Sequence, residues 1–252
     1  GEYLHFRRSA TNNNKLIIDR LNGTLNSCEI CEFDDLCDTK DVIKKFNFEP
    51  GFRVGAAYMT RRWSLEGTYL WIHEWEGHCS ASLAGGLFFS EHHPFVLNDY
   101  ANADHAETQY ESRFQNAEIN YFRHVTPRKE NYVSCSWLLG LRYVYLSENL
   151  DIAYTKGEST SNYEIAAGNH MPAIQIGGAI EWRPMKHLSW NFVAKVGMGY
   201  DWAGQETFVR DFDNTVTVHH FHASGQQFPP FVADGAMVVG YQFCKFLEGH
   251  LG

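Results

Sequence analysis

The sequence lacks any long apolar run: its longest stretches, such as Gly85–Phe89, are only a few residues. A transmembrane helix needs about 20 mostly apolar residues in a row, so we expect none. Positive charge is also scarce, with 21 Lys and Arg against 30 Asp and Glu and a formal net charge of −9. Because phosphate binding requires clustered Lys and Arg, we expect no nucleic-acid partner. The first residues lack the basic and apolar character of a signal peptide, so we expect a mature or incomplete chain.

Proline is sparse, with 7 residues against 21 Gly, while aromatic residues make up 15% of the 252 residues. This composition suits strands and turns better than helices. The clearest pattern runs from Leu188 to Tyr200, where the even positions are all apolar and the odd positions are mostly small or polar. Because side chains alternate across a strand, this segment is expected to have one apolar and one polar face. A membrane is not excluded, since β-barrels cross it with alternating segments of about 9–11 residues.

Similar alternation predicts nine strands, namely Glu2–Arg8, Phe52–Met59, Trp63–His73, Gln109–Val125, Val133–Leu146, Ala173–Trp182, Leu188–Asp201, Phe231–Phe243 and one that begins at Leu247. Short links join successive pairs at Thr60–Arg62, Thr126–Tyr132, Arg183–His187 and Cys244–Phe246. The remaining connections are long and polar, at residues 9–51, 74–108, 147–172 and 202–230. Alternation of short turns with long external loops is typical of outer-membrane barrels.

The two faces of the predicted strands differ in character. Charged residues lie in mid-strand on the face that we expect to line a lumen: Arg53, Glu66, Glu118, Arg142, Glu181, Lys195 and Asp234. Aromatic residues near strand ends lie on the face that we expect to meet lipid: Tyr58, Trp63, Trp71, Tyr121, Trp137, Tyr145, Trp182, Trp190, Tyr200 and Tyr241. A polar interior and aromatic girdles are expected in a bilayer. A soluble lipocalin-like barrel or β-sandwich would show the same alternation and stays an alternative.

We therefore predict an all-β fold, an antiparallel up-and-down transmembrane β-barrel that forms a single domain over residues 1–252. Bacterial single-chain barrels have an even number of strands. Nine signals then predict a barrel of ten strands, or twelve, with the last strand or strands missing from the chain.

The six cysteines are Cys28, Cys31, Cys37, Cys79, Cys135 and Cys244. An even number permits disulfides in an exported protein, but the sequence does not determine their pairing. Cys28, Cys31 and Cys37 crowd one acidic stretch, where a zinc site would need a fourth ligand. We expect a disulfide or reduced thiols there and no bound metal or cofactor.

Several segments, in order, resemble the β-barrel porin family of planctomycetes. They are Gly51–Tyr58, Trp63–Leu70, Ala117–Tyr121, Leu139–Leu150, Asn169–Glu181, Ala194–Gly199 and Met237–Gly252, and together they cover over half the chain. The chain departs from the family at Met171 and Pro172, where an aromatic residue and Gly are usual. It also lacks the family's final strand, so the number of strands stays open. The resemblance implies a barrel in the bacterial outer membrane.

Two groups of residues resemble catalytic or metal-binding sites, Asp104 with His105, and the trio His219, His220 and His222. Both lie in predicted loops without a strand-anchored partner, so we expect no enzyme. Two functions stay open. The chain is expected either to act as a narrow porin for small hydrophilic solutes, or to be a non-conducting barrel that assembles with other envelope proteins or with copies of itself through its long loops.

Overall fold

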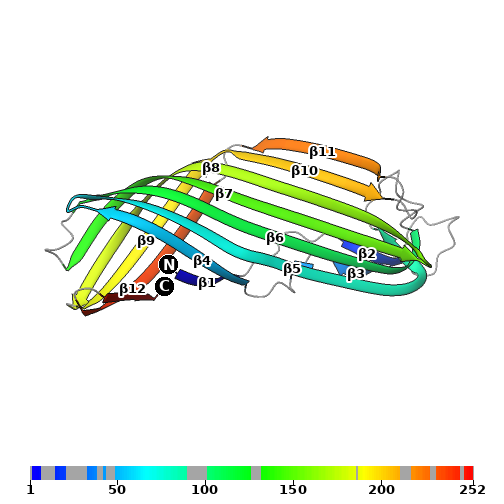
Figure 1. Ribbon diagram of the computed structural model, residues 1–252, viewed down its shortest axis with the longest axis horizontal. Helices are drawn as coiled ribbons and strands as arrows, with labels where there is room; N and C mark the ends of the chain where they lie inside the picture. The colour runs from blue at the N-terminus through cyan, green and yellow to red at the C-terminus, as the bar shows by residue number, and fades with distance from the viewer. Residues whose placement is uncertain are drawn as a thin grey trace.

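The computed structural model describes residues 2–6, 15–20, 33–38, 42–43, 49–89, 101–125, 132–185, 187–210, 217–227, 231–244 and 247–251. Nearly all of them lie in antiparallel strands of one sheet, which curls into a half-barrel (Figure 1). The predicted all-β antiparallel class is therefore confirmed. The described residues contain no helix that is long and apolar enough to cross a membrane.

The main path of the sheet follows chain order with antiparallel neighbours. It comprises β1 (Glu2–Phe6), β4 (Glu49–Met59), β5 (Trp63–Phe89), β6 (Ala101–His124), β7 (Val133–Lys156), β8 (Ser159–Met185), β9 (Leu188–Gly199), β12 (Phe231–Cys244) and β13 (Leu247–Leu251). Within the described ranges the path ends at β1 and β13, which do not pair with each other. Barrel closure, insertion in a membrane and a number of ten or twelve strands stay predictions.

Four further strands lie off this path. After Tyr200, β10 (Asp201–Arg210) follows β9, pairs with β8 and forms a hairpin with β11 (Thr217–Gln227). A second hairpin consists of β2 (Lys15–Arg20) and β3 (Phe33–Asp38). Its strand β2 pairs with the end of β5, where Ile17 faces Phe89. These four strands lie at one end of the molecule, beside the long ends of β5 to β8 (Figure 1).

The predicted long loops are wrong. Most of residues 74–108 and 147–172 extend β5, β6, β7 and β8, which are 24 to 27 residues long. The segment 202–230 contains β10 and β11, and the segment 9–51 contains β2, β3 and the start of β4. The prediction failed because the polar character of these segments was interpreted as a sign of loops. The segments instead continue the strands, but their polar side chains lie on the face that is apolar in the adjoining parts of the same strands. We call the part of the sheet formed by residues 72–89, 101–114, 146–171, 201–210 and 217–227 the extension.

A β-bulge marks where the extension begins on β5. Ile72 pairs with Phe114 and Trp75 pairs with Ser112, so that His73 and Glu74 together face Arg113 alone. The extra residue reverses which positions of β5 point to each face. This change of parity explains why the sequence pattern of the third predicted strand stopped at His73.

The core of the molecule lies in the extension. One buried cluster consists of Val42, Cys79, Leu87, Ala103, Ala106, Ile152, Tyr154, Tyr163 and Val209, and another of Ile43, Ile72 and Trp75. Because Val42 and Ile43 belong to the first connection, that connection contributes to the core of the extension. Cys79 is disulfide-bonded, whereas Cys135 has a reduced thiol. Cys28 and Cys31 lie outside the described residues, and of Cys37 and Cys244 only the backbone is described.

Candidate functional site

The strand register places all seven predicted lumen residues on one face of the sheet, which we call the inner face. Directly opposed residues on neighbouring strands share a face. Glu118 opposes Arg142, and Lys195 opposes Asp234. Glu66 opposes Asn120, which lies two residues from Glu118 and so shares its face. The pairing of the neighbouring strands places Arg53 and Glu181 on this face as well. All ten predicted girdle aromatics have the opposite parity, on the outer face. Lining of a lumen and contact with lipid stay predictions.

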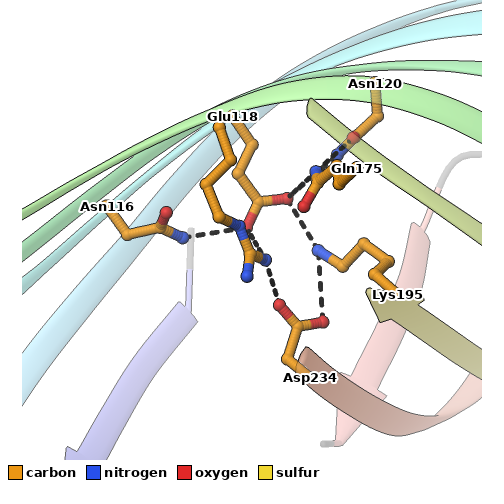
Figure 2. Close-up of polar contacts among 7 residues, drawn as sticks. Asn116, Glu118, Asn120, Gln175, Lys195 and Asp234 are labelled. Carbon is orange, nitrogen blue, oxygen red and sulfur yellow. Dashed lines mark hydrogen bonds and ion pairs between the residues drawn. The ribbon is translucent and has the colours of Figure 1, made fainter. Parts of the chain in front are cut away.

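Four of the seven charged residues form a ring, which we call the charge ring: Glu118, Arg142, Asp234 and Lys195. Arg142 Nη2 lies 2.5 Å from Glu118 Oε1 and also contacts Asp234 Oδ2. Lys195 Nζ lies 2.7 Å from Glu118 Oε2 and 3.5 Å from Asp234 Oδ1. Each charge therefore touches both charges of opposite sign, and the formal charge of the ring is zero (Figure 2).

Glu118 is the most heavily bonded member of the charge ring. Besides the two cations, Asn116 Nδ2, Asn120 Nδ2 and Gln175 Nε2 donate to its carboxylate at 2.8, 3.0 and 3.1 Å (Figure 2). Its side chain is only 2% exposed. A buried carboxylate is tolerated only when cations and donors replace its water. The three amide donors supply what two ion pairs alone would leave unsatisfied.

The contacts of the charge ring show how tightly the sheet curls. Glu118 on β6 reaches Lys195 on β9 across β7 and β8, and Arg142 on β7 reaches Asp234 on β12 across β8 and β9. Side chains of non-neighbouring strands meet only on the concave side of a curled sheet. The inner face is therefore concave at this level, and the charge ring spans it.

Small residues make this close approach possible. Gly177 pairs with Lys195, and a Cβ at Gly177 would clash with the backbone oxygen of Ala194 and lie 3.0 Å from Lys195 Cα. Gly140 pairs with Asn120, and a Cβ there would clash with Asn120 Oδ1. Both glycines thus leave the space that the polar side chains of the neighbouring strand occupy.

The other three predicted lumen residues lie around the charge ring. Glu181 accepts a hydrogen bond from Ser134 Oγ at 3.3 Å and pairs with Arg183 at 2.6 Å. Arg53 and Glu66 line a cavity of about 530 Å³, which Glu118, Lys195 and Asp234 also border. A second cavity of about 330 Å³ includes Glu66 and Glu181 and lies toward the short turns. The two cavities share Glu66, so the inner face is hollowed from the charge ring toward the short turns.

The outer face carries two groups of aromatic rings. In the first, Trp63 lies 5.5 Å from Tyr58 and 6.1 Å from Tyr121, which in turn lies 6.1 Å from Trp137. Trp182, Trp190 and Tyr241 occupy corresponding positions on β8, β9 and β12.

The second aromatic group lies further along the strands, next to the extension. Trp71 lies 5.4 Å from Phe52, Tyr145 lies 4.8 Å from His170, and Tyr200 lies 5.3 Å from Trp202. Between the two groups the outer face is aliphatic and exposed, with Val54, Ile119, Leu141, Ile174, Ile176, Val196 and Met198. The aliphatic residues and the two aromatic groups form a belt that leaves large apolar side chains uncovered.

The polarity of both faces reverses in the extension. Its outer face carries Glu74, Glu76, His78, Glu107, Glu111, Asp151 and Glu164, whereas its inner face carries the buried apolar clusters. Along β6, for example, the outer positions change from Ile119 to Glu111 and Glu107, and the inner positions change from Glu118 to Ala106. One continuous sheet is therefore apolar outside at one end and apolar inside at the other.

The two groups that resembled catalytic or metal sites have other contacts. Asp104 accepts from the backbone N–H groups of Gly85 at 2.8 Å and Gly157 at 3.0 Å, and these two bonds lower the pKa of its carboxyl group. His105 Nδ1 lies 2.8 Å from Ser82 Oγ. His222 lies 3.8 Å from Glu206, while the side chains of His219 and His220 lie outside the described part.

The predicted site missed the amides Asn116, Asn120 and Gln175, together with Ser134 and Arg183. The parity of the strands identifies them, because Asn116 and Asn120 are two residues from Glu118 on either side. The prediction used charge to select the site, and an uncharged amide in a strand looks the same in sequence as an exposed polar residue. Comparison with known proteins adds no relative: no protein-family model matches the chain, and no curated protein sequence matches it significantly.

Proposed function

We propose that this chain forms a narrow β-barrel in the bacterial outer membrane that lets small hydrophilic solutes diffuse through its lumen. The reversal of polarity along the continuous strands carries this proposal. A sheet in water buries its apolar face throughout, and a sheet in lipid exposes it. The apolar belt fits lipid, and the extension, with its polar outer face and apolar core, fits water on the side opposite to the short turns.

The length of the belt supports the same placement. Eight residues separate Trp63 from Trp71 on β5, which corresponds to about 26 Å at about 3.3 Å per residue. With a strand tilt of about 40°, the thickness is roughly 20 Å, close to the apolar band of about 25 Å in outer-membrane barrels. The partner of the belt is then the lipid bilayer.

Conductance in planar bilayers, with the refolded chain, tests the channel. We expect stepwise conductance and a preference between K⁺ and Cl⁻ that depends on inner-face charges. Glu66→Gln should shift the reversal potential in a salt gradient toward weaker cation preference. Glu107→Gln, which removes the same charge from the outer face of the extension, should not shift it. A silent bilayer, or equal shifts from both variants, would contradict a lumen lined by the inner face.

A second function is favoured by the burial of the charge ring. The side chains of Glu118, Arg142 and Lys195 are 2%, 3% and 7% exposed, so they fill the concave side at their level. A filled barrel would hold the extension at the cell surface as an assembly component for envelope proteins or copies of itself. Crosslinking in intact cells through the exposed outer-face positions Ser80 and Glu107 should then trap a partner, whereas a lone monomer would contradict this function.

A further inference from the structure

The charge ring contains two kinds of contact. Glu118 with Arg142, and Lys195 with Asp234, are directly opposed residues of neighbouring strands. We call these the neighbour pairs. The other two contacts, Glu118 with Lys195 and Arg142 with Asp234, each cross the concave face over two intervening strands. We call these the crossing pairs.

We propose that the charge ring is a gate, which is closed when the crossing pairs are formed and open when only the neighbour pairs remain. This inference rests on the proposed function as a channel. In the open state Glu118 still pairs with Arg142, and Lys195 still pairs with Asp234. No charge loses all of its partners, so the large cost of leaving a buried charge unpaired does not oppose opening.

The surroundings of the charge ring leave room for the open state. Four inner-face positions beside the crossing pairs on β8 and β9 are small: Ala173, Gly177, Gly197 and Gly199. Between Ala173 and Gly177 lies Gln175, which is fully buried and donates to Glu118 and Asn120. Once the crossing pairs separate, Gln175 is the one large side chain among these positions, and its bond to Asn120 holds it beside β6. Asp234 is the most exposed member, at 38%, and borders the cavity of about 530 Å³. Its carboxylate can therefore move toward that cavity while it stays beside Lys195.

Charge swaps within the neighbour pairs separate the two kinds of contact. The double variant Glu118→Arg with Arg142→Glu keeps its neighbour pair, but makes both crossing pairs repulsive, Arg with Lys195 and Glu with Asp234. The double variant Lys195→Glu with Asp234→Lys does the same from the other side. Combining all four substitutions makes every contact attractive again. None of these variants changes the net charge of the lumen.

Single-channel recordings in planar bilayers test the gate. We expect the unmodified protein and the fourfold variant to show rare, brief openings, and each double variant to raise the open-to-closed ratio by roughly tenfold or more, because two charge-assisted contacts become repulsive. Lys195→Gln, a smaller change, should raise the ratio to an intermediate level. Heat-modifiable migration in gels checks that each variant is folded.

The possible failures are distinct. Conductance with the same open-to-closed ratio in all variants would overturn the gate and leave the channel intact. Silence of the unmodified protein and of every folded variant would overturn the channel, and the gate with it.

Discussion

Lys195 Nζ lies 2.7 Å from Glu118 Oε2, although 77 residues and two intervening strands separate these side chains. Both are buried, at 7% and 2% exposure. The contact therefore depends on the curvature of the sheet and not on the pairing of two neighbouring strands. It also makes Glu118 dependent on a residue far away in the chain.

Lys195→Met should destabilise the folded protein by about 3 kcal/mol, because it removes a cation from a buried carboxylate. In Lys195→Met combined with Glu118→Gln, the total cost should be smaller than the sum of the single costs. Urea unfolding in lipid vesicles, followed by Trp fluorescence, measures the three values. Additive costs would show that the two side chains do not stabilise each other.

The polarity reversal predicts different responses to one substitution along β8. Ile174 is 62% exposed on the outer face of the belt, and Ala166 is exposed on the outer face of the extension. Ile174→Arg should cost about 2–4 kcal/mol in a bilayer, because it places a charge in lipid. Ala166→Arg should change stability by less than about 0.5 kcal/mol, as surface substitutions usually do. Equal costs in vesicles would argue against lipid around the belt.

The two parts of the sheet differ in how far their strands could be predicted. In the belt, apolar outer residues such as Ile174 and Ile176 alternate with polar inner ones. Of the described residues in the predicted strands, all but Val125 and Tyr200 lie in observed strands. In the extension the same alternation continues with the faces exchanged, and the bulge at His73 and Glu74 shifts it on β5. The prediction assumed that the same face stays apolar along a strand, so the predicted strands ended where the apolar and polar faces are exchanged.

The charge ring could be predicted only in part. Glu118, Arg142, Lys195 and Asp234 were all predicted on one face, because the alternation of side chains along a strand can be read from the sequence around each residue. Which of them meet depends on sheet curvature, which the register of four strand pairs and the small residues beneath the ring determine together. The prediction selected only charged residues, so it missed neutral donors such as Gln175, which is fully buried.

The glycine beside Lys195 allows a further test of packing on the inner face. Gly177→Ala should destabilise the protein by about 1–3 kcal/mol, because the new methyl group would overlap the backbone of β9 and force a local shift. Gly178→Ala is the matched control on the outer face, where the nearest atom to a Cβ is Ser136 O at 3.6 Å. It should have little effect in the same vesicle unfolding assay. A larger cost for the control would place the crowded face on the wrong side of the sheet.

Asp104 on β6 connects two hairpins, since it binds Gly85 near the end of β5 and Gly157 in the turn between β7 and β8. Both glycines adopt positive φ, at 62° and 60°, which L side chains rarely adopt. The backbone bonds lower the pKa of Asp104 below its ordinary value of 3.8. A lowered pKa means that the stabilisation is fully present above pH 3.8 and is lost as the pH falls through the folded-state pKa.

NMR of the ¹⁵N-labelled protein in detergent micelles measures this directly. The amide resonances of Gly85 and Gly157 should titrate together, with one apparent pKa below 3.8, and move upfield as Asp104 becomes protonated. In Asp104→Asn, which keeps one acceptor oxygen and has no titrating carboxyl group, this titration should disappear and only one glycine amide should keep its bonded shift. The substitution Asp151→Asn, on the outer face of the same extension, should leave the titration of both glycines unchanged. Separate titrations of the two amides, or a titration that survives in Asp104→Asn, would show that this carboxylate does not join the hairpins.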